Sequence, residues 1–379
     1  MSDALTMSTP GINIVGAGLG GLTLARGLVK RGVPFTLYER TSCAPRHGYG
    51  ITLHAYAYRP LLELLNMDET TFKRCVAVDA TLGGTGRMNP KRLVQPGLVG
   101  SDCFRAHCAR LEDLLREGLE VRWDHKVEKV ERTDGGSTLW LSNGQRIEQT
   151  CLVGADGVHA STRNSLLPNA KLNVLPFVTF NGKRRVKRSI FDGLYAPVMK
   201  DSNVLEERIN GTLLQISLND IAEDTVSLSW VFSRTARGPG DPLYKPNRPP
   251  SGATEIPDDF FEEVRSLTGL GQPFKDVFDT DKLNSDRVLS WLMRTTEVES
   301  ADLESLARHG IFIVGDAAHA QPILGGEGAS AAISDAVGLA GMIAANDPQV
   351  LSDWYRSKLP IWSRGTEKSK VHIDMLHNQ

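Results

Sequence analysis

Cysteines are scarce in this sequence and are not clustered. Five cysteines are scattered among 379 residues, and none forms a Cys-x-x-Cys pair. A disulfide framework or a cysteine-rich zinc site requires paired or closely spaced cysteines. We therefore expect reduced thiols, a cytoplasmic location and no metal site.

An excess of charge of one sign and long apolar runs are also missing. Lys and Arg number 43 against 45 Asp and Glu, so the net charge is −2. Nucleic-acid-binding proteins usually carry a positive field, so we expect no nucleic-acid partner. No run approaches the about 18 to 20 apolar residues of a membrane helix, and residues 1–10 do not resemble a signal peptide. The sequence predicts a soluble protein without a membrane span, and its length suits two domains or one large α/β unit.

A glycine-rich turn stands between an apolar strand predicted at 12–15 and a helix predicted at 22–30. In Gly16-Ala17-Gly18-Leu19-Gly20-Gly21, glycine suits a tight turn at 16, close approach of a pyrophosphate at 18 and helix packing at 21. Glu39 ends the next strand, where a carboxylate accepts hydrogen bonds from ribose hydroxyls. This context favours binding of FAD or NAD over a merely structural turn. Arg40 is ambiguous, because it could contact a cofactor or be a solvated charge.

Two further motifs also follow short apolar strands. Gly154-Ala155-Asp156-Gly157 follows a strand predicted at 151–153, and Gly315-Asp316-Ala317-Ala318-His319 follows one at 311–314. Gly326-Glu327-Gly328 and a helix of small residues at 328–345 come next. Three such motifs in this order are far more specific than any one of them.

The rest of the chain predicts a second sheet and a terminal helix. Turn signals between apolar runs at 121–132, 137–141 and 146–152 predict a β-meander. Runs at 213–218 and 225–232 predict a separate sheet. Residues 237–252 hold eight Gly or Pro in sixteen positions, which favours a surface loop or lid. The tail at 351–379 is amphipathic and predicts a capping helix interrupted at Pro360.

With these motifs the chain resembles the class A FAD-dependent monooxygenases. This family includes para-hydroxybenzoate and salicylate hydroxylases, kynurenine 3-monooxygenase and the tetracycline-inactivating monooxygenases, and the resemblance covers about residues 11–345. It implies that FAD is bound by one series of residues, namely Gly16, Gly18, Gly21, Glu39, Gly48, Gly50, Asp156, Gly157, Asp316, Gly326 and Gly328. The helix that begins near Gly328 would point its positive N-terminal dipole at the flavin pyrimidine ring.

The resemblance also implies an α/β architecture with a discontinuous first domain. We expect an FAD-binding, doubly wound Rossmann-like domain with an inserted β-sheet substrate domain and a C-terminal helix. The predicted FAD-binding domain comprises 11–82, 101–176 and 296–345, the substrate-binding domain 83–100 and 177–295, and the helical cap 346–379.

The chain departs from the family pattern at two places. Cys108 stands where the family usually has an Arg, and Arg105 could substitute for it if residues 105–108 form a helical turn. Pro322 lies farther from the Gly-x-Gly pair than is usual. For the substrate pocket, candidates are Tyr195, Gln215, Trp230 and Pro322, with ordinary core or surface roles as the alternative. No catalytic residue is assigned, and His319 is expected to be structural. The basic run 183–188 could receive NADPH phosphates or be a solvated hairpin or linker.

The activity that the resemblance implies is monooxygenation. NADPH or NADH would reduce the flavin, O2 would add to it, and a flavin C4a-hydroperoxide would hydroxylate or epoxidise an aromatic or polycyclic small-molecule metabolite, as in secondary metabolism. A monomer or a dimer is expected. The alternatives are a flavin-dependent reductase or dehydrogenase, and a non-redox protein that keeps FAD while binding its ligand.

Overall fold

A five-stranded parallel sheet forms the centre of the first domain. The computed structural model describes residues 11–44, 48–89, 102–345 and 348–378. The sheet order is β17 (Ile311–Ile313), β9 (Cys151–Gly154), β1 (Ile12–Val15), β2 (Phe35–Tyr38) and β5 (Val121–Arg122). Ile14 pairs with Leu37 on one side and Val153 on the other. β1 is buried throughout, as expected of a central strand whose two faces are both covered.

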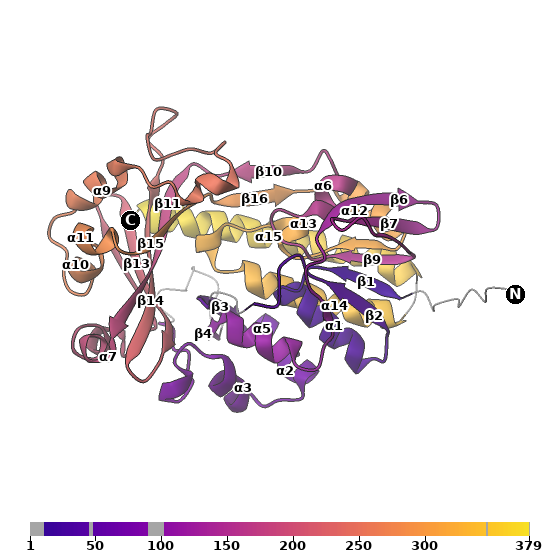
Figure 1. Ribbon diagram of the computed structural model, residues 1–379, viewed down its shortest axis with the longest axis horizontal. Helices are drawn as coiled ribbons and strands as arrows, with labels where there is room; N and C mark the ends of the chain where they lie inside the picture. The colour runs from indigo at the N-terminus through magenta and orange to yellow at the C-terminus, as the bar shows by residue number, and fades with distance from the viewer. Residues whose placement is uncertain (1–10, 45–47, 90–101, 346–347, 379) are drawn as a thin grey trace, which may run out of the picture.

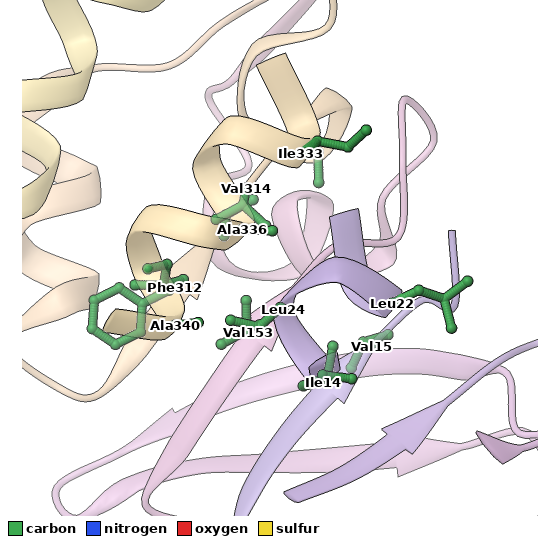
Figure 2. Packing of buried hydrophobic residues seen from close by; sticks show 14 of the residues in the cluster. Ile14, Val15, Leu22, Leu24, Val153, Phe312, Val314, Ile333, Ala336 and Ala340 are labelled. Carbon is green, nitrogen blue, oxygen red and sulfur yellow. The ribbon is translucent and has the colours of Figure 1, made fainter. Parts of the chain in front are cut away.

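Two helices of small residues pack closely beside this sheet. α1 (Leu19–Lys30) contacts α14 (Gly328–Ala345), and Figure 2 shows Leu24, Ala336 and Ala340 in the apolar cluster that joins them to the strands. A Cβ atom at Gly27 would lie 2.4 Å from the Cβ of Ala340. The close helix packing predicted from the small residues is therefore observed.

The predicted meander is present, but its outer boundaries were wrong. β6 (Val127–Thr133), β7 (Gly136–Leu141) and β8 (Arg146–Gln149) form a three-stranded antiparallel sheet. β5 and β9, which the prediction merged with it, belong to the parallel sheet instead. Asp124, with φ of 58°, turns the chain between β5 and β6. Such a left-handed residue breaks a strand that looks continuous in sequence.

The second domain is built on a five-stranded antiparallel sheet. Its order is β12 (Val204–Ile209), β13 (Thr212–Ile221), β14 (Thr225–Thr235), β11 (Phe177–Lys187) and β15 (Arg287–Trp291). Side chains alternate between its faces. The outer face carries Phe180, Leu214 and Trp230 and packs with the helices at 258–278. The inner face carries buried polar residues such as Ser217 and Asn219 and faces the first domain, where Asn219 contacts Gly50.

Short elements connect the two domains. β10 (Lys171–Val174) pairs with β16 (Arg294–Glu297), and β3 (Gly50–His54) pairs with β4 (Cys103–His107). The main connecting helices are α2 (Ala55–Leu65), α3 (Glu69–Val76), α5 (Cys108–Arg116), α6 (Ser161–Leu166), α9 (Asp258–Arg265), α10 (Phe274–Val277), α11 (Thr280–Leu283) and α12 (Ser300–Ala307). The remaining short helical segments are η1 (Ala80–Leu82), α7 (Arg188–Ile190), η2 (Phe191–Tyr195), α8 (Ala196–Met199), η3 (Pro250–Thr254), α13 (Asp316–His319) and η4 (Ile323–Gly325).

The C-terminal helix, α15 (Pro348–Asn378), extends along both domains (Figure 1). It contacts α12 and α14 of the first domain and β13 and β14 of the second. The predicted interruption at Pro360 is wrong, since the helix continues through this residue. Pro360 is exposed, so water can reach the carbonyl group that loses its helical hydrogen bond.

One helix also corrects the expectation about apolar runs. α14 has 18 residues with a mean hydropathy of 1.4, which meets the length and composition of a membrane span. However, 39% of it is buried in the protein, and its small side chains pack against α1. Its place beside the parallel sheet is that of a core helix.

The Gly/Pro-rich loop at 237–252 is anchored rather than free. Asp241 is buried, and its carboxylate accepts hydrogen bonds from Arg234 and from the backbone N–H groups of Arg237 and Leu243. Arg234 also donates to Glu263 of α9 at 2.7 Å. The predicted irregular backbone is observed up to Pro250, where η3 begins. The loop is thereby pinned to the second domain, which argues against a freely moving lid.

Candidate active site

The three sequence motifs meet at one edge of the parallel sheet. β17, β9 and β1 are neighbours, and each motif starts where its strand ends. Backbone hydrogen bonds continue across this edge, from Ala155 N to Val15 O at 2.8 Å and from Val314 N to Gly154 O at 2.9 Å. The carboxyl end of a parallel sheet, where ligands bind in doubly wound folds, therefore carries all three motifs.

The glycines of the first motif meet different steric demands. Gly16 has φ of 105°, and a Cβ atom there would lie 2.4 Å from the Ala155 carbonyl oxygen. At Gly21 a Cβ atom would lie 1.9 Å from the Gly16 carbonyl oxygen. At Gly18, by contrast, nothing lies within 4 Å of the Cβ position. Gly16 and Gly21 thus serve the fold itself, whereas the absence of a side chain at Gly18 leaves room for a ligand at the start of α1.

Glu39 lies beside this turn and is buried. Its Oε2 accepts from Ala17 N at 2.8 Å, and its Oε1 accepts from Thr41 N at 3.0 Å. These bonds hold the carboxylate next to the glycine turn, and a carboxylate has further lone pairs for ribose hydroxyls. Arg40 is exposed and lies close enough to His159 to help lower the pKa of that imidazole, after burial and Arg294. Arg40 therefore belongs to a positively charged group at the surface.

Asp156 organises the second motif. Its carboxylate accepts from Thr162 N at 3.0 Å and from Thr162 Oγ1 at 2.5 Å. Burial raises the pKa of Asp156. Gly157 adopts φ of 81°, which lets the chain turn toward α6. The neighbouring Arg163 donates to Ala317 O at 3.0 Å and so links the second motif to the third.

Asp316 and His319 take different directions in the third motif. Burial raises the pKa of Asp316, yet the residue is accessible to solvent. The His319 ring is instead hydrogen-bonded to Asp335 and stacks on Trp362 with a centroid distance of 4.1 Å. His319 therefore has the structural position expected, and Asp316 is free to face a ligand.

The loop before α14 is tied to the strand β3. Gly326 adopts φ of 75°, and a Cβ atom at Gly328 would lie 3.5 Å from Asp316 Oδ1. Glu327 accepts from the Tyr56 hydroxyl at 2.6 Å and lies 3.4 Å from His54 Nε2. The start of α14 is therefore held beside Asp316, as the predicted flavin site requires. Pro322 is buried at the start of the same loop.

Gly48 and Gly50 leave space for two side chains of β4. A Cβ atom at Gly48 would lie 2.2 Å from His107 Nε2, and one at Gly50 would lie 2.6 Å from Arg105 Nε. Tyr49, between them, is hydrogen-bonded to Cys108, and its pKa is raised chiefly by that thiol. These contacts fix the path of the segment that the sequence placed beneath the flavin.

Arg105 does not lie on a helical turn, so the condition for its substitution at the Cys108 position is not met. Residues 103–107 form the strand β4, and α5 begins at Cys108. Arg105 extends from β4 to Ser217 on the inner face of the second sheet, with Nη2 and Oγ separated by 3.4 Å. Its surroundings therefore differ from those of the glycine turn that the cofactor's phosphates would contact.

The pocket candidates fall on two faces of the second sheet. Gln215 lies on the inner face and donates to Glu206 at 3.0 Å. Trp230 and Tyr195 are buried in the outer-face core, where they donate to Asp286 and Asp276. The structure does not bring them together with Gln215, because Trp230 pairs with Ile216, the next residue along β13. Their placement removes Trp230 and Tyr195 from a pocket between the domains.

The basic run 183–188 is neither a hairpin nor one continuous patch. It lies at the end of β11 and the start of α7. Arg184 is buried and forms a bidentate pair with Asp286. Lys183 points inward, donates to Gly48 O, and lies 5.8 Å from the centre of the Tyr49 ring. The alternation of a strand divides these charges between two faces.

Sequence reasoning missed the polar residues of the inner face. Ser217, Asn219 and Ser229 are buried, and Asn219 joins the domains by accepting from Gly50 N at 3.0 Å and donating to Ser229 at 2.7 Å. Alternation in the predicted strand 213–218 was the available signal. The alternation alone could not show which face of the strand meets the first domain.

The fold and site define a flavoprotein of the FAD-dependent monooxygenase family, to which the chain belongs. It is 32% identical over 349 residues to the FAD-dependent monooxygenase adaC of Aspergillus niger, covering 88% of this chain and 84% of that protein. Residues 14–45 match the NAD(P)-binding Rossmann-like domain and residues 282–350 match the FAD binding domain. The expected family and cofactor are confirmed.

Solved structures show the same fold at low sequence identity. The 2,6-dihydroxypyridine-3-hydroxylase from Arthrobacter nicotinovorans aligns with a TM-score of 0.71 and 20% identity, covering 98% of this chain and 94% of that one. The Diels-Alderase PyrE3 of pyrroindomycin biosynthesis aligns with a TM-score of 0.70 and 18% identity, covering 97% and 74%. The predicted α/β fold is confirmed, and it is shared by proteins named for different reactions.

Proposed function

We propose that this FAD-dependent monooxygenase hydroxylates or epoxidises an aromatic or polycyclic small molecule bound between the parallel sheet and the inner face of the second sheet. The convergence of Gly18, Glu39 and Asp316 at one sheet edge, opposite a polar sheet face, carries the proposal. FAD, when bound, supplies the redox and oxygen chemistry.

The chain's own residues would bind and orient the reactants. We assign the glycine turn and Glu39 to the adenosine and pyrophosphate side, and Asp316 to the polyol side of the cofactor. α14 begins at Gly328 beside Asp316, and its N-terminal dipole would stabilise negative charge there. Asn219 and the linked Tyr56–Glu327 pair hold the strand β3 in place, which would limit the entry of water.

A positively charged group near the glycine turn supports binding of the reductant's phosphates. Arg40, Arg294 and Arg163 all act on His159, whose pKa is lowered by burial and by these charges. Since Arg184 is committed to Asp286, we place the phosphates of NADPH or NADH at the Arg40–Arg294 group, in preference to the basic run.

An oxygen-labelling experiment tests the proposed reaction. We expect that a substrate found by its stimulation of NAD(P)H consumption will gain one oxygen atom, and that in 18O2 this atom will carry the label. Turnover without oxygen would instead indicate a reductase or dehydrogenase. Conversion of a ligand without consumption of NAD(P)H would favour the non-redox alternative, for which the fold shared with a Diels-Alderase is the relevant observation.

A further inference from the structure

Arg105 lies at the boundary between the two domains and has a fixed backbone. Its N–H donates to Gly86 O at 2.7 Å, and its carbonyl accepts from Val78 N at 3.1 Å. The side chain leaves β4 opposite Thr52, its cross-strand partner, and Nη1 lies 3.3 Å from Thr52 Oγ1. Nη2 lies 3.4 Å from Ser217 Oγ on the second sheet. The guanidinium therefore spans the space between the strand pair and the inner sheet face.

This guanidinium is half-buried and has little compensation for its charge. Nε is buried without a hydrogen-bond partner among the residues that the structure describes. Desolvation of the guanidinium lowers the pKa of Arg105 to about 10, and no carboxylate among the described residues counteracts that effect. Among the described residues, its five N–H donors thus have two long contacts, both with neutral hydroxyls.

Three arginines that are buried are satisfied in a different way. Arg184 is paired with Asp286, and Arg234 is paired with Asp241 and Glu263. Arg163 donates to the carbonyl oxygens of Ala317 and Val158. An unpaired buried charge is costly, so proteins usually supply a partner or a ligand for it. Among the described residues, Arg105 differs from these three in having neither a carboxylate nor a backbone carbonyl as a hydrogen-bond acceptor.

The position of Arg105 indicates what kind of ligand it would meet. Ser217 lies between Gln215 and Asn219 on the inner face, and successive residues of one face are about 7 Å apart. Asn219 contacts Gly50 of the segment assigned to the flavin. A group bound at Arg105 would therefore lie between the flavin side and Gln215, within the space proposed for the substrate.

We propose that Arg105 is a specificity-determining residue that binds an anionic oxygen of the substrate, either a carboxylate or the ionised oxygen of an acidic phenol or enol. This inference rests on the proposed function for the location of the substrate. The guanidinium would hold such an oxygen in charge-assisted hydrogen bonds, with Ser217 and Thr52 fixing its orientation.

Binding to the oxidised holoenzyme tests the proposal without turnover. The probes are 1-hydroxy-2-naphthoate and its neutral carboxamide, with affinities measured by calorimetry at neutral pH. We expect the wild-type enzyme to prefer the carboxylate. Arg105→Gln should weaken carboxylate binding about 10- to 100-fold and change carboxamide binding little. Arg105→Lys should lie between them, because it keeps the charge but loses the planar fork.

Control measurements separate this role from a structural one. Arg59→Gln, which removes an exposed arginine paired with Asp102, should change neither affinity. Thermal unfolding of probe-free Arg105→Gln holoenzyme should show no loss of stability, since a half-buried charge without a carboxylate partner is removed. If that variant does not retain FAD, the selectivity of Arg105→Lys decides the question.

Three results would overturn the proposal. They are a wild-type enzyme without preference for the carboxylate, an equal loss of both probes in the variants, and a loss of FAD affinity with unchanged probe selectivity. The last result would assign Arg105 to the cofactor. Failure of the proposed function would appear separately, as bound FAD in the wild-type enzyme that NAD(P)H does not reduce.

Discussion

Replacing two glycines of the same turn by alanine should separate folding from cofactor binding. Gly21→Ala places a methyl group 1.9 Å from the Gly16 carbonyl oxygen, so backbone atoms must move. Overpacking of this kind costs about 1 to 3 kcal/mol, and we expect at least that loss in the free energy of unfolding of the apoprotein. Gly18→Ala meets nothing within 4 Å, and its φ of −85° suits any L residue. Its apoprotein should lose at most about 1 kcal/mol, the cost of alanine at a helix N-cap.

When FAD affinity is measured by quenching of flavin fluorescence, Gly18→Ala should show the larger loss of the two variants. The methyl group of Gly18→Ala would occupy the approach of the pyrophosphate, and about 1 to 3 kcal/mol of strain corresponds to an affinity roughly 5- to 150-fold lower. Gly135→Ala is the matched control, because this exposed glycine also has an open Cβ position and lies in the remote β6–β7 hairpin. Wild-type FAD affinity in Gly18→Ala would refute the assignment of this turn to the cofactor.

The remaining predictions concern the second domain. Asp241→Asn should destabilise the protein by about 3 to 5 kcal/mol in chemical denaturation, because it leaves the buried Arg234 undercompensated, whereas Arg237→Ala, which removes an exposed cation, should cost less than about 1 kcal/mol. The hydrogen bonds from Arg234 lower the pKa of Asp241 in the folded protein. The stabilising contribution of this carboxylate is therefore complete above its unfolded pKa of about 4 and should be lost as the pH falls below that value. In urea unfolding, the wild-type protein should lose more stability between neutral and acidic pH than Asp241→Asn does. Trp230→Phe should lower the melting temperature but leave the KM for substrate unchanged, since Trp230 lies in the outer-face core; a changed KM with normal stability would contradict that placement.

Local signals in the sequence were sufficient for the first domain's motifs. The strand, glycine turn and helix at residues 12–30 depend on contacts between near neighbours, and the small-residue helix at 328–345 has the predicted bounds. The positions of Asp156 and Asp316 at one sheet edge could be predicted, because each motif stands at the end of a parallel strand.

Features that depend on long-range pairing could not be predicted in this way. β5 and β9 look like parts of a meander until their partners in the parallel sheet are known. Whether Trp230 faced the outer core or the inner face depended on the register of β14 against β13. The role of Arg105 likewise depended on the strand β4 and on a second-domain contact more than 100 residues away, at Ser217. The domain boundaries, which the sequence analysis gives to the nearest residue, stay a prediction.

The visible spectrum of the purified protein, recorded with NADPH first without oxygen and then in air, tests the central claim most directly. We predict a yellow protein whose flavin bands bleach anaerobically and return when air is admitted. A colourless protein that cannot be reconstituted with FAD would contradict the cofactor site built from Gly18, Glu39 and Asp316. A yellow protein that neither NADPH nor NADH bleaches, even with aromatic ligands present, would contradict the monooxygenase activity.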